Sequence, residues 1–341
     1  MPEAGGGTYA RNVSRPSSRP SRGGLSILAP VALAVLAGAG LATQSRVNGT
    51  LADHVGSGYL AAVISFGSGL LALSLALLVS RRGRRGMRRI GAALRGGPGS
   101  PGGDGPLLRP WQCLGGAAGG FFVASQGLAV GTLGVAVFIV AFVTGQSLGS
   151  VVVDRLGLGP GGVRFVTLPR AIGPLLTVVA VGIAMSGDVA SPSALVLAVL
   201  PLLAGVGSAW QQAVNGRMRA AAGDVLAATF VNFVVGTTAL VLALGVSLLF
   251  DGLPDGVLPG NPLLYTGGMI GIGFIAVGAA VVHRVGVLVL SLSMIAGQIV
   301  GALVLDLAVP GATAPGPATY LGAALTLVAV AVPLTFERRA A

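Results

Sequence analysis

Ten separate runs of mostly apolar residues constrain the fold of this chain more than any other feature of its sequence. A helix of about 20 apolar residues crosses the roughly 30 Å hydrocarbon core of a bilayer. No charged residue lies near the centre of any run. We therefore expect an all-α polytopic membrane protein with ten transmembrane helices, over residues 25–47, 58–80, 111–130, 133–153, 168–187, 192–213, 225–249, 263–283, 286–306 and 319–336.

The composition excludes an ordinary soluble enzyme. Only 9% of the residues are charged, against roughly 25% in a typical soluble domain. The two glutamates, Glu3 and Glu337, lie near the chain ends, and the one cysteine, Cys113, excludes an internal disulfide. With no motif for a nucleophile and its base, and no cluster of metal ligands, we expect no enzymatic activity, no cofactor and no metal site.

The arginines indicate the orientation of the chain. With the N-terminus placed inside and the ten runs crossing alternately, all 21 arginines except Arg46 fall on the inner side. Positive residues are retained on the cytoplasmic side of membrane proteins. The net charge of +11 is thus interpreted as an orientation signal and not as a nucleic-acid surface. We expect a multi-pass protein of the bacterial inner (plasma) membrane with both termini in the cytoplasm.

Three segments lie outside the membrane in this scheme. Residues 1–24 form an arginine-containing tail, residues 337–341 a short C-terminal tail, and residues 81–109 an arginine-rich cytoplasmic loop. The tail over 1–24 and the loop are rich in glycine, serine and proline, and are expected to be disordered. The loop has two interpretations, a contact with anionic lipids or nucleic acid and a determinant of topology. The second is favoured, and anionic lipid is retained as a partner.

The sequence contains an internal repeat. Residues 38–49 (GAGLATQSRVNG) and 205–216 (GVGSAWQQAVNG) are identical at seven of twelve positions, at an offset of 167. Residues 115–154 match 267–306 without gaps at an offset of 152, with fourteen of forty positions identical. The repeat unit contains five apolar runs, so the second copy must enter the membrane in the opposite sense. The prediction is two inverted five-helix repeats, over 25–187 and 192–336, which is the architecture of secondary transporters.

The duplicated motifs also resemble a known family. QxxVNG at Gln44–Gly49 and Gln211–Gly216, GQxxG at Gln146 and Gln298, and the run VVVDRLGL are similar to the YdcZ-like branch of the drug/metabolite transporter superfamily. The resemblance covers residues 25–336. It implies an inner-membrane exporter or permease of small molecules, in which the fifth and tenth spans are peripheral and the other eight surround a cavity.

Uncharged amides are the candidate substrate ligands. An amide offers two donors and an acceptor, and can bind a solute without placing a charge in lipid. The alternative is that these side chains join helices or cap their ends. The candidates are Gln44, Asn48, Gln146, Gln211, Asn215, Asn232 and Gln298.

Asp154 and Asp306 correspond in the repeat and end the fourth and ninth runs. Carboxylates near a pathway can carry protons. They can equally be interfacial residues or partners of arginines, which is the favoured interpretation because neither lies at the centre of a run.

The predicted function is therefore a secondary transporter, in the exporting direction, that moves a small metabolite or drug-like solute by alternating access. The alternative is a membrane scaffold or regulatory subunit that retains the transporter fold without transport. The expected partners are the solute, the lipid bilayer and, in a homodimer, a second copy of the chain.

Overall fold

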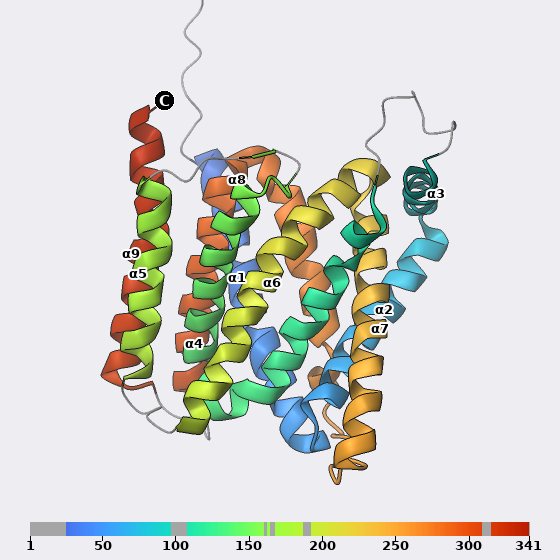
Figure 1. Cartoon of the computed structure of the whole chain (residues 1–341), viewed down its shortest axis with the longest axis horizontal. Helices are drawn as coiled ribbons and strands as arrows, with labels where there is room; N and C mark the ends of the chain where they lie inside the picture. The colour runs from blue at the N-terminus through green and yellow to red at the C-terminus, as the bar shows by residue number, and fades with distance from the viewer. Residues whose placement is uncertain are drawn as a thin grey trace, which may run out of the picture.

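The structure, a computed structural model, describes residues 25–96, 108–159, 162–163, 168–186, 192–308 and 315–340. The predicted tail over 1–24 and most of the segment 97–109 lie outside the described residues. The described part is a bundle of long helices (Figure 1). In chain order these are α1 (Leu25–Val55), α2 (Gly58–Val79), α3 (Arg81–Arg95), η1 (Pro110–Leu114), α4 (Gly115–Arg155), α5 (Leu168–Met185), α6 (Pro192–Ala222), α7 (Val225–Asp251), η2 (Pro262–Tyr265), α8 (Gly267–Ala308) and α9 (Pro317–Ala340).

The expected all-α membrane class is confirmed. Among the described residues, five helices are long and apolar enough to cross a membrane, and shorter apolar helical segments lie at Ile172–Ala184, Gly267–Val277, Ser293–Ala308 and Pro317–Ala329. The ten apolar runs fall within eight helices, because the third and fourth runs share α4 and the eighth and ninth share α8. Large apolar side chains such as Leu36, Leu78 and Leu242 are exposed on the outside of the bundle, as expected for surfaces that face lipid.

Helix α4 consists of two arms that meet at Gly134. Gly134 has a φ of 75° and a ψ of 162°, a conformation that glycine adopts without steric cost. The arms form a V, teal and green in Figure 1. The second arm begins with free backbone N–H groups, as any helix does. Asp306 accepts two of them, from Val135 (3.1 Å) and Ala136 (2.7 Å).

Helix α8 also turns back on itself (Figure 1). Its Gly271 lies against Gln44 of α1, and its Gly301 lies against Ala39 of the same helix. Gln44 and Ala39 are five residues apart, or about 7.5 Å along a helix. Two positions thirty residues apart on α8 can reach neighbouring turns of α1 only if α8 reverses between them.

Glycines bring pairs of helices into close contact. Gly38 of α1 faces the backbone of Met294 in α8, and Gly205 of α6 faces the backbone of Phe142 in α4. An added Cβ at either glycine would overlap the carbonyl oxygen of the residue that it faces. Gly38 and Gly205 correspond at the offset of 167, so the α1–α8 and α4–α6 contacts are built in the same way. Small residues at helix contacts are the usual means of association in lipid.

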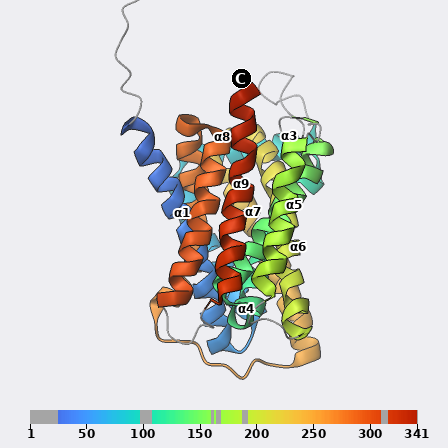
Figure 2. The ribbon, with the colours of Figure 1, turned by 90° about the vertical axis from the view of Figure 1, so that its left-hand side faces the viewer.

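Helices α5 and α9 lie side by side at one edge of the bundle (Figures 1 and 2). They meet at Gly322, where a Cβ would press on the Ala180 carbonyl oxygen and on Ala184. The start of α1 and the end of α9 lie at the same end of the bundle (Figure 2). Helix α3 stands outside the bundle near that end (Figure 1).

The prediction of disorder across 81–109 is wrong for residues 81–95, which form α3. The Ser80 side chain accepts a hydrogen bond from the Gly83 N–H (3.0 Å) and caps the helix start, and Gly96 ends it with a φ of 62°. One face of α3 packs Ile90 and small residues into a cluster that includes Met218. This segment contains few apolar residues, so the helical spacing of its buried positions is not evident from its arginine- and glycine-rich composition. The C-terminal tail expected from residue 337 also differs, since α9 continues to Ala340.

Candidate functional site

A cavity of about 140 Å³ lies in the bundle among α1, α2, α4, α6, α7 and α8. Its lining combines amides with aromatic and small side chains, and none of the described residues that line it is charged. The lining residues are Leu41, Gln44, Phe66, Gly119, Phe122, Val123, Phe142, Gln146, Ser208, Gln211, Gln212, Asn215, Asn232, Phe233, Gly271, Phe274, Ile275 and Gln298.

Most of the lining residues correspond to one another in the sequence repeat. Pairs that join α1 to α6 and α2 to α7 share the offset of 167, and pairs that join α4 to α8 share the offset of 152. The pairs are Leu41 with Ser208, Gln44 with Gln211, Phe66 with Phe233, Gly119 with Gly271, Phe122 with Phe274, Val123 with Ile275, and Gln146 with Gln298. The cavity is therefore formed where the two halves of the chain meet.

Six of the seven amides selected from the sequence line this cavity. The exception is Asn48, which is fully buried beside it. Asn48 Nδ2 donates to Gln126 Oε1 (2.6 Å), and Gln126 Nε2 donates to Ser45 Oγ (2.8 Å). We name Ser45, Asn48 and Gln126 the closed cluster. Asn48 thus lies outside the cavity lining and pairs through Nδ2 with Gln126, a residue that was not predicted from the sequence, while Asn48 Oδ1 is buried without a hydrogen bond from the described residues.

Asn215 is the counterpart of Asn48 and lines the cavity. The position that corresponds to Gln126 in the second half is Gly278, which has no amide to offer. Asn215 Oδ1 is buried and accepts no hydrogen bond from the described residues. Two differences between the repeat copies, Gln126 against Gly278 and Ser45 against Gln212, therefore separate the closed cluster from the corresponding positions at the cavity.

Gln44 and Gln211 are held in matching places. Gln44 packs against Gly271 and donates from Nε2 to the backbone oxygen of Gly267 (2.8 Å). Gln211 packs against Gly119, the counterpart of Gly271. Its Nε2 donates to Asn232 Oδ1 (3.3 Å) instead of a backbone oxygen. The absent Cβ at each glycine leaves the space that the amide occupies.

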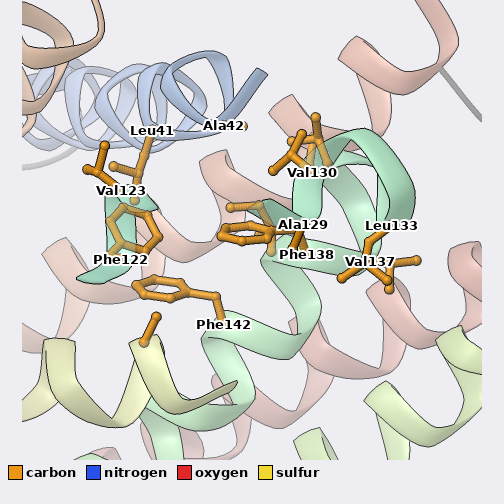
Figure 3. Packing of buried hydrophobic residues seen from close by; sticks show 14 of the residues in the cluster. Leu41, Ala42, Phe122, Val123, Ala129, Val130, Leu133, Val137, Phe138 and Phe142 are labelled. Carbon is orange, nitrogen blue, oxygen red and sulfur yellow. The ribbon is translucent and has the colours of Figure 1, made fainter. Parts of the chain in front are cut away.

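Aromatic rings form the apolar part of the cavity. Phe66 and Phe233 stack with their centroids 4.8 Å apart, and Phe122 and Phe142 lie 4.5 Å apart. Figure 3 shows the second pair beside Leu41 of α1. None of these rings was predicted from the sequence as part of the site. The same two offsets would have found Phe66 with Phe233 and Phe122 with Phe274, because each pair repeats at the spacing of the polar motifs.

The two aspartates lie outside the cavity lining. Asp306 is 5% exposed and caps the second arm of α4. Asp154 lies half-buried near the end of α4. The observed contacts give Asp306 a structural role at the Gly134 break, which neither interpretation of the sequence included. No group of three or more potential metal ligands occurs within the described ranges.

Comparison with known proteins identifies the family. A protein-family profile described as "Putative inner membrane exporter, YdcZ" matches residues 29–183 and 196–332, which are the two halves of the repeat. One solved structure, described as "Crystal structure of protein", is similar over 92% of this chain and 98% of its own, with 20% identity and a TM-score of 0.48. No curated protein matches the chain. Because the profile covers most of the sequence in two copies, this multi-pass inner-membrane protein belongs to the YdcZ family of exporters in the drug/metabolite transporter superfamily.

Proposed function

We propose that the protein is a secondary transporter that exports a small solute by alternating access through the central cavity. The observation that carries this proposal is the lining of the cavity by residues that correspond between the two repeat copies. A site at a repeat interface can face either side of the membrane if the two halves exchange conformations. A scaffold has no need for a polar cavity at that place.

The proposal includes ten membrane spans arranged as two inverted repeats. Each arm of α4 and each arm of α8 supplies one span, which makes four. The other six long helices supply one span each. Matching contacts support this arrangement. Gly38 and Gly205 contact the backbone of a neighbouring helix in equivalent ways. The contact of Gly271 with Gln44 is likewise equivalent to that of Gly119 with Gln211.

Transport in proteoliposomes tests the role of the cavity. Gln146→Leu and Gln298→Leu remove amides from it, and each lost hydrogen bond to a solute lowers affinity by about tenfold or more. Gln126→Leu is the matched control, since it makes the same chemical change in the closed cluster. We expect the first two variants to reduce transport per folded molecule and the control to leave it unchanged. Unchanged transport in all three would reject the site. Absence of transport of every solute in a broad screen by the folded wild-type chain would favour the scaffold.

We further propose that both termini and α3 face the cytoplasm. The start of α1, α3 and the end of α9 gather at one end of the bundle (Figure 1), and nearly all arginines are assigned to that side. Alkaline phosphatase fused after Ala341 should be inactive, and phosphatase inserted after Asp255, in the opposite loop, should be active. The reverse pattern would invert the topology.

We also propose that α3 binds anionic lipid at this surface. Its arginines are exposed, and Arg84 and Arg88 border a shallow groove with the apolar Leu77 and Met87. Such a groove suits a phosphate headgroup with its first acyl carbons. Native mass spectrometry should show that Arg84→Gln/Arg88→Gln retains less phosphatidylglycerol than wild type, with neutral lipid unchanged. Equal retention would refute the proposal.

A further inference from the structure

Three buried oxygens of the cavity residues lack a hydrogen-bond donor. They are Gln44 Oε1, Asn215 Oδ1 and Gln298 Oε1, and no described residue donates to any of them. Gln44 is 4% exposed and Gln298 is 3% exposed. A desolvated acceptor without a donor costs free energy, so a protein retains several in one place only where something compensates. All three belong to residues that line the same cavity.

The orientation of the Gln44 amide is fixed by its partner. Its Nε2 lies 2.8 Å from the Gly267 carbonyl oxygen, which can only accept a hydrogen bond. Exchanging the amide nitrogen and oxygen would place two acceptors against each other. The unpaired atom of Gln44 is therefore an acceptor, and its missing partner is a donor.

The rest of the cavity selects the body of the ligand. Its volume of about 140 Å³ is close to the roughly 150 Å³ of an engineered apolar cavity that binds benzene. Phe66, Phe122, Phe142, Phe233 and Phe274 offer ring surfaces, and the faces of aromatic rings attract cations. No described cationic side chain lines the cavity to neutralise a carboxylate.

We infer that the cavity takes a compact solute with a primary ammonium group at its polar end and a body of about one aromatic ring. A primary ammonium has three N–H donors and no acceptor, so it can supply the donor that Gln44 Oε1 lacks and has two further N–H groups for the other unpaired oxygens. This inference rests on the proposed function, because it names the class of solute that the proposed transporter carries.

Calorimetric titration of the full chain in detergent at pH 7 tests the class of solute without requiring transport. The probes share one ring and one chain length: 2-phenylethylamine, 2-phenylethanol, 3-phenylpropanoate and ethylbenzene. We expect the amine to bind at least about tenfold more tightly than the alcohol, because it satisfies more acceptors, and the carboxylate to bind more weakly than the alcohol. A carboxylate or alcohol that binds as tightly as the amine would overturn the inference.

Variants localise the binding. Gln298→Leu and Asn215→Leu should each weaken amine binding by about tenfold, while Gln126→Leu in the closed cluster leaves the Kd of the folded fraction unchanged. Gln298→Glu keeps the side-chain shape and adds an anionic acceptor, so at pH 8 it should tighten amine binding and not alcohol binding. The predicted increase in amine affinity of Gln298→Glu keeps the test decisive if a leucine variant fails to fold. Amine affinity that is insensitive to all cavity variants would overturn the assignment.

Different outcomes would refute the proposal of transport and the proposal of a primary ammonium ligand. Amine binding that depends on the cavity variants, without uptake by proteoliposomes, would refute transport and leave the ligand class standing. Cavity-dependent transport of carboxylates but not amines would support transport and refute the ligand class.

Discussion

Asn48 and Asn215 occupy the same position of a duplicated motif, and the structure gives them different roles. Asn48 is fully buried and donates to Gln126, whereas Asn215 lines the cavity; the Oδ1 of each is buried without a hydrogen bond from the described residues. The two motifs are identical at seven of twelve positions and differ at one member of the closed cluster, Ser45, whose counterpart is Gln212. Another member also differs, since Gln126 corresponds to Gly278. The same motif position is thus paired inside the bundle in one repeat copy and lines the cavity in the other.

The largest loss of stability should come from the two equivalent glycine contacts, and it should be similar in the two halves. Gly38→Ala and Gly205→Ala each place a Cβ against a backbone oxygen, which no side-chain rotation relieves. We expect each to lower the free energy of unfolding by about 3 kcal/mol or more, measured by thermal unfolding in detergent.

Gly67→Ala and Gly245→Ala are the controls, because a Cβ at these positions meets nothing within 4 Å. They should unfold near the wild-type temperature. Sensitivity at Gly38 but not at Gly205 would show that the two helix contacts are not equivalent.

The next largest loss of stability should come from a change in the surroundings of Asn48 and not of Asn215. Gln126→Leu leaves Asn48 Nδ2 without its acceptor and Ser45 without its donor. We expect a loss of about 1–2 kcal/mol in the free energy of unfolding, read from chemical denaturation in detergent. A variant as stable as wild type would mean that the closed cluster contributes nothing to the fold.

A double-mutant cycle sharpens the same contrast. Asn48→Ala and Gln126→Ala should be coupled by about 0.6–1 kcal/mol, since the two amides are 2.6 Å apart. Asn215→Ala combined with Gln126→Ala should be additive within about 0.3–0.5 kcal/mol. Equal coupling in the two cycles would contradict the assignment of Gln126 to Asn48 alone.

The smallest change in stability should come from Asn215→Leu. Its oxygen is already unpaired, so an apolar replacement removes a desolvation cost and no bond to that atom. We expect the free energy of unfolding to stay within about 0.5 kcal/mol of wild type, while solute affinity falls. A destabilisation as large as that of Gln126→Leu would assign Asn215 a structural role like that of Asn48.

The sequence by itself determined the membrane class, the positions of the apolar runs, the duplication and six of the amides that line the cavity. Each follows from a local rule, since hydropathy reports on lipid exposure and a repeated motif places equivalent groups at equivalent positions. Even α3 had a local signal, because Gly83, Gly86, Ile90 and Ala93 recur at helical spacing. Arginine and glycine content obscured it.

Only the tertiary structure decided which amides face a cavity and which are paired inside the bundle. The closed cluster joins positions 78 and 81 residues apart in sequence, and Asp306 reaches backbone groups 170 and 171 residues away. Such pairings depend on how the arms of α4 and α8 fold back, which composition and periodicity do not encode. Side-chain pairing is a property of the packed bundle: Asn48 Nδ2 donates to Gln126 inside the bundle, whereas Asn215 lines the cavity.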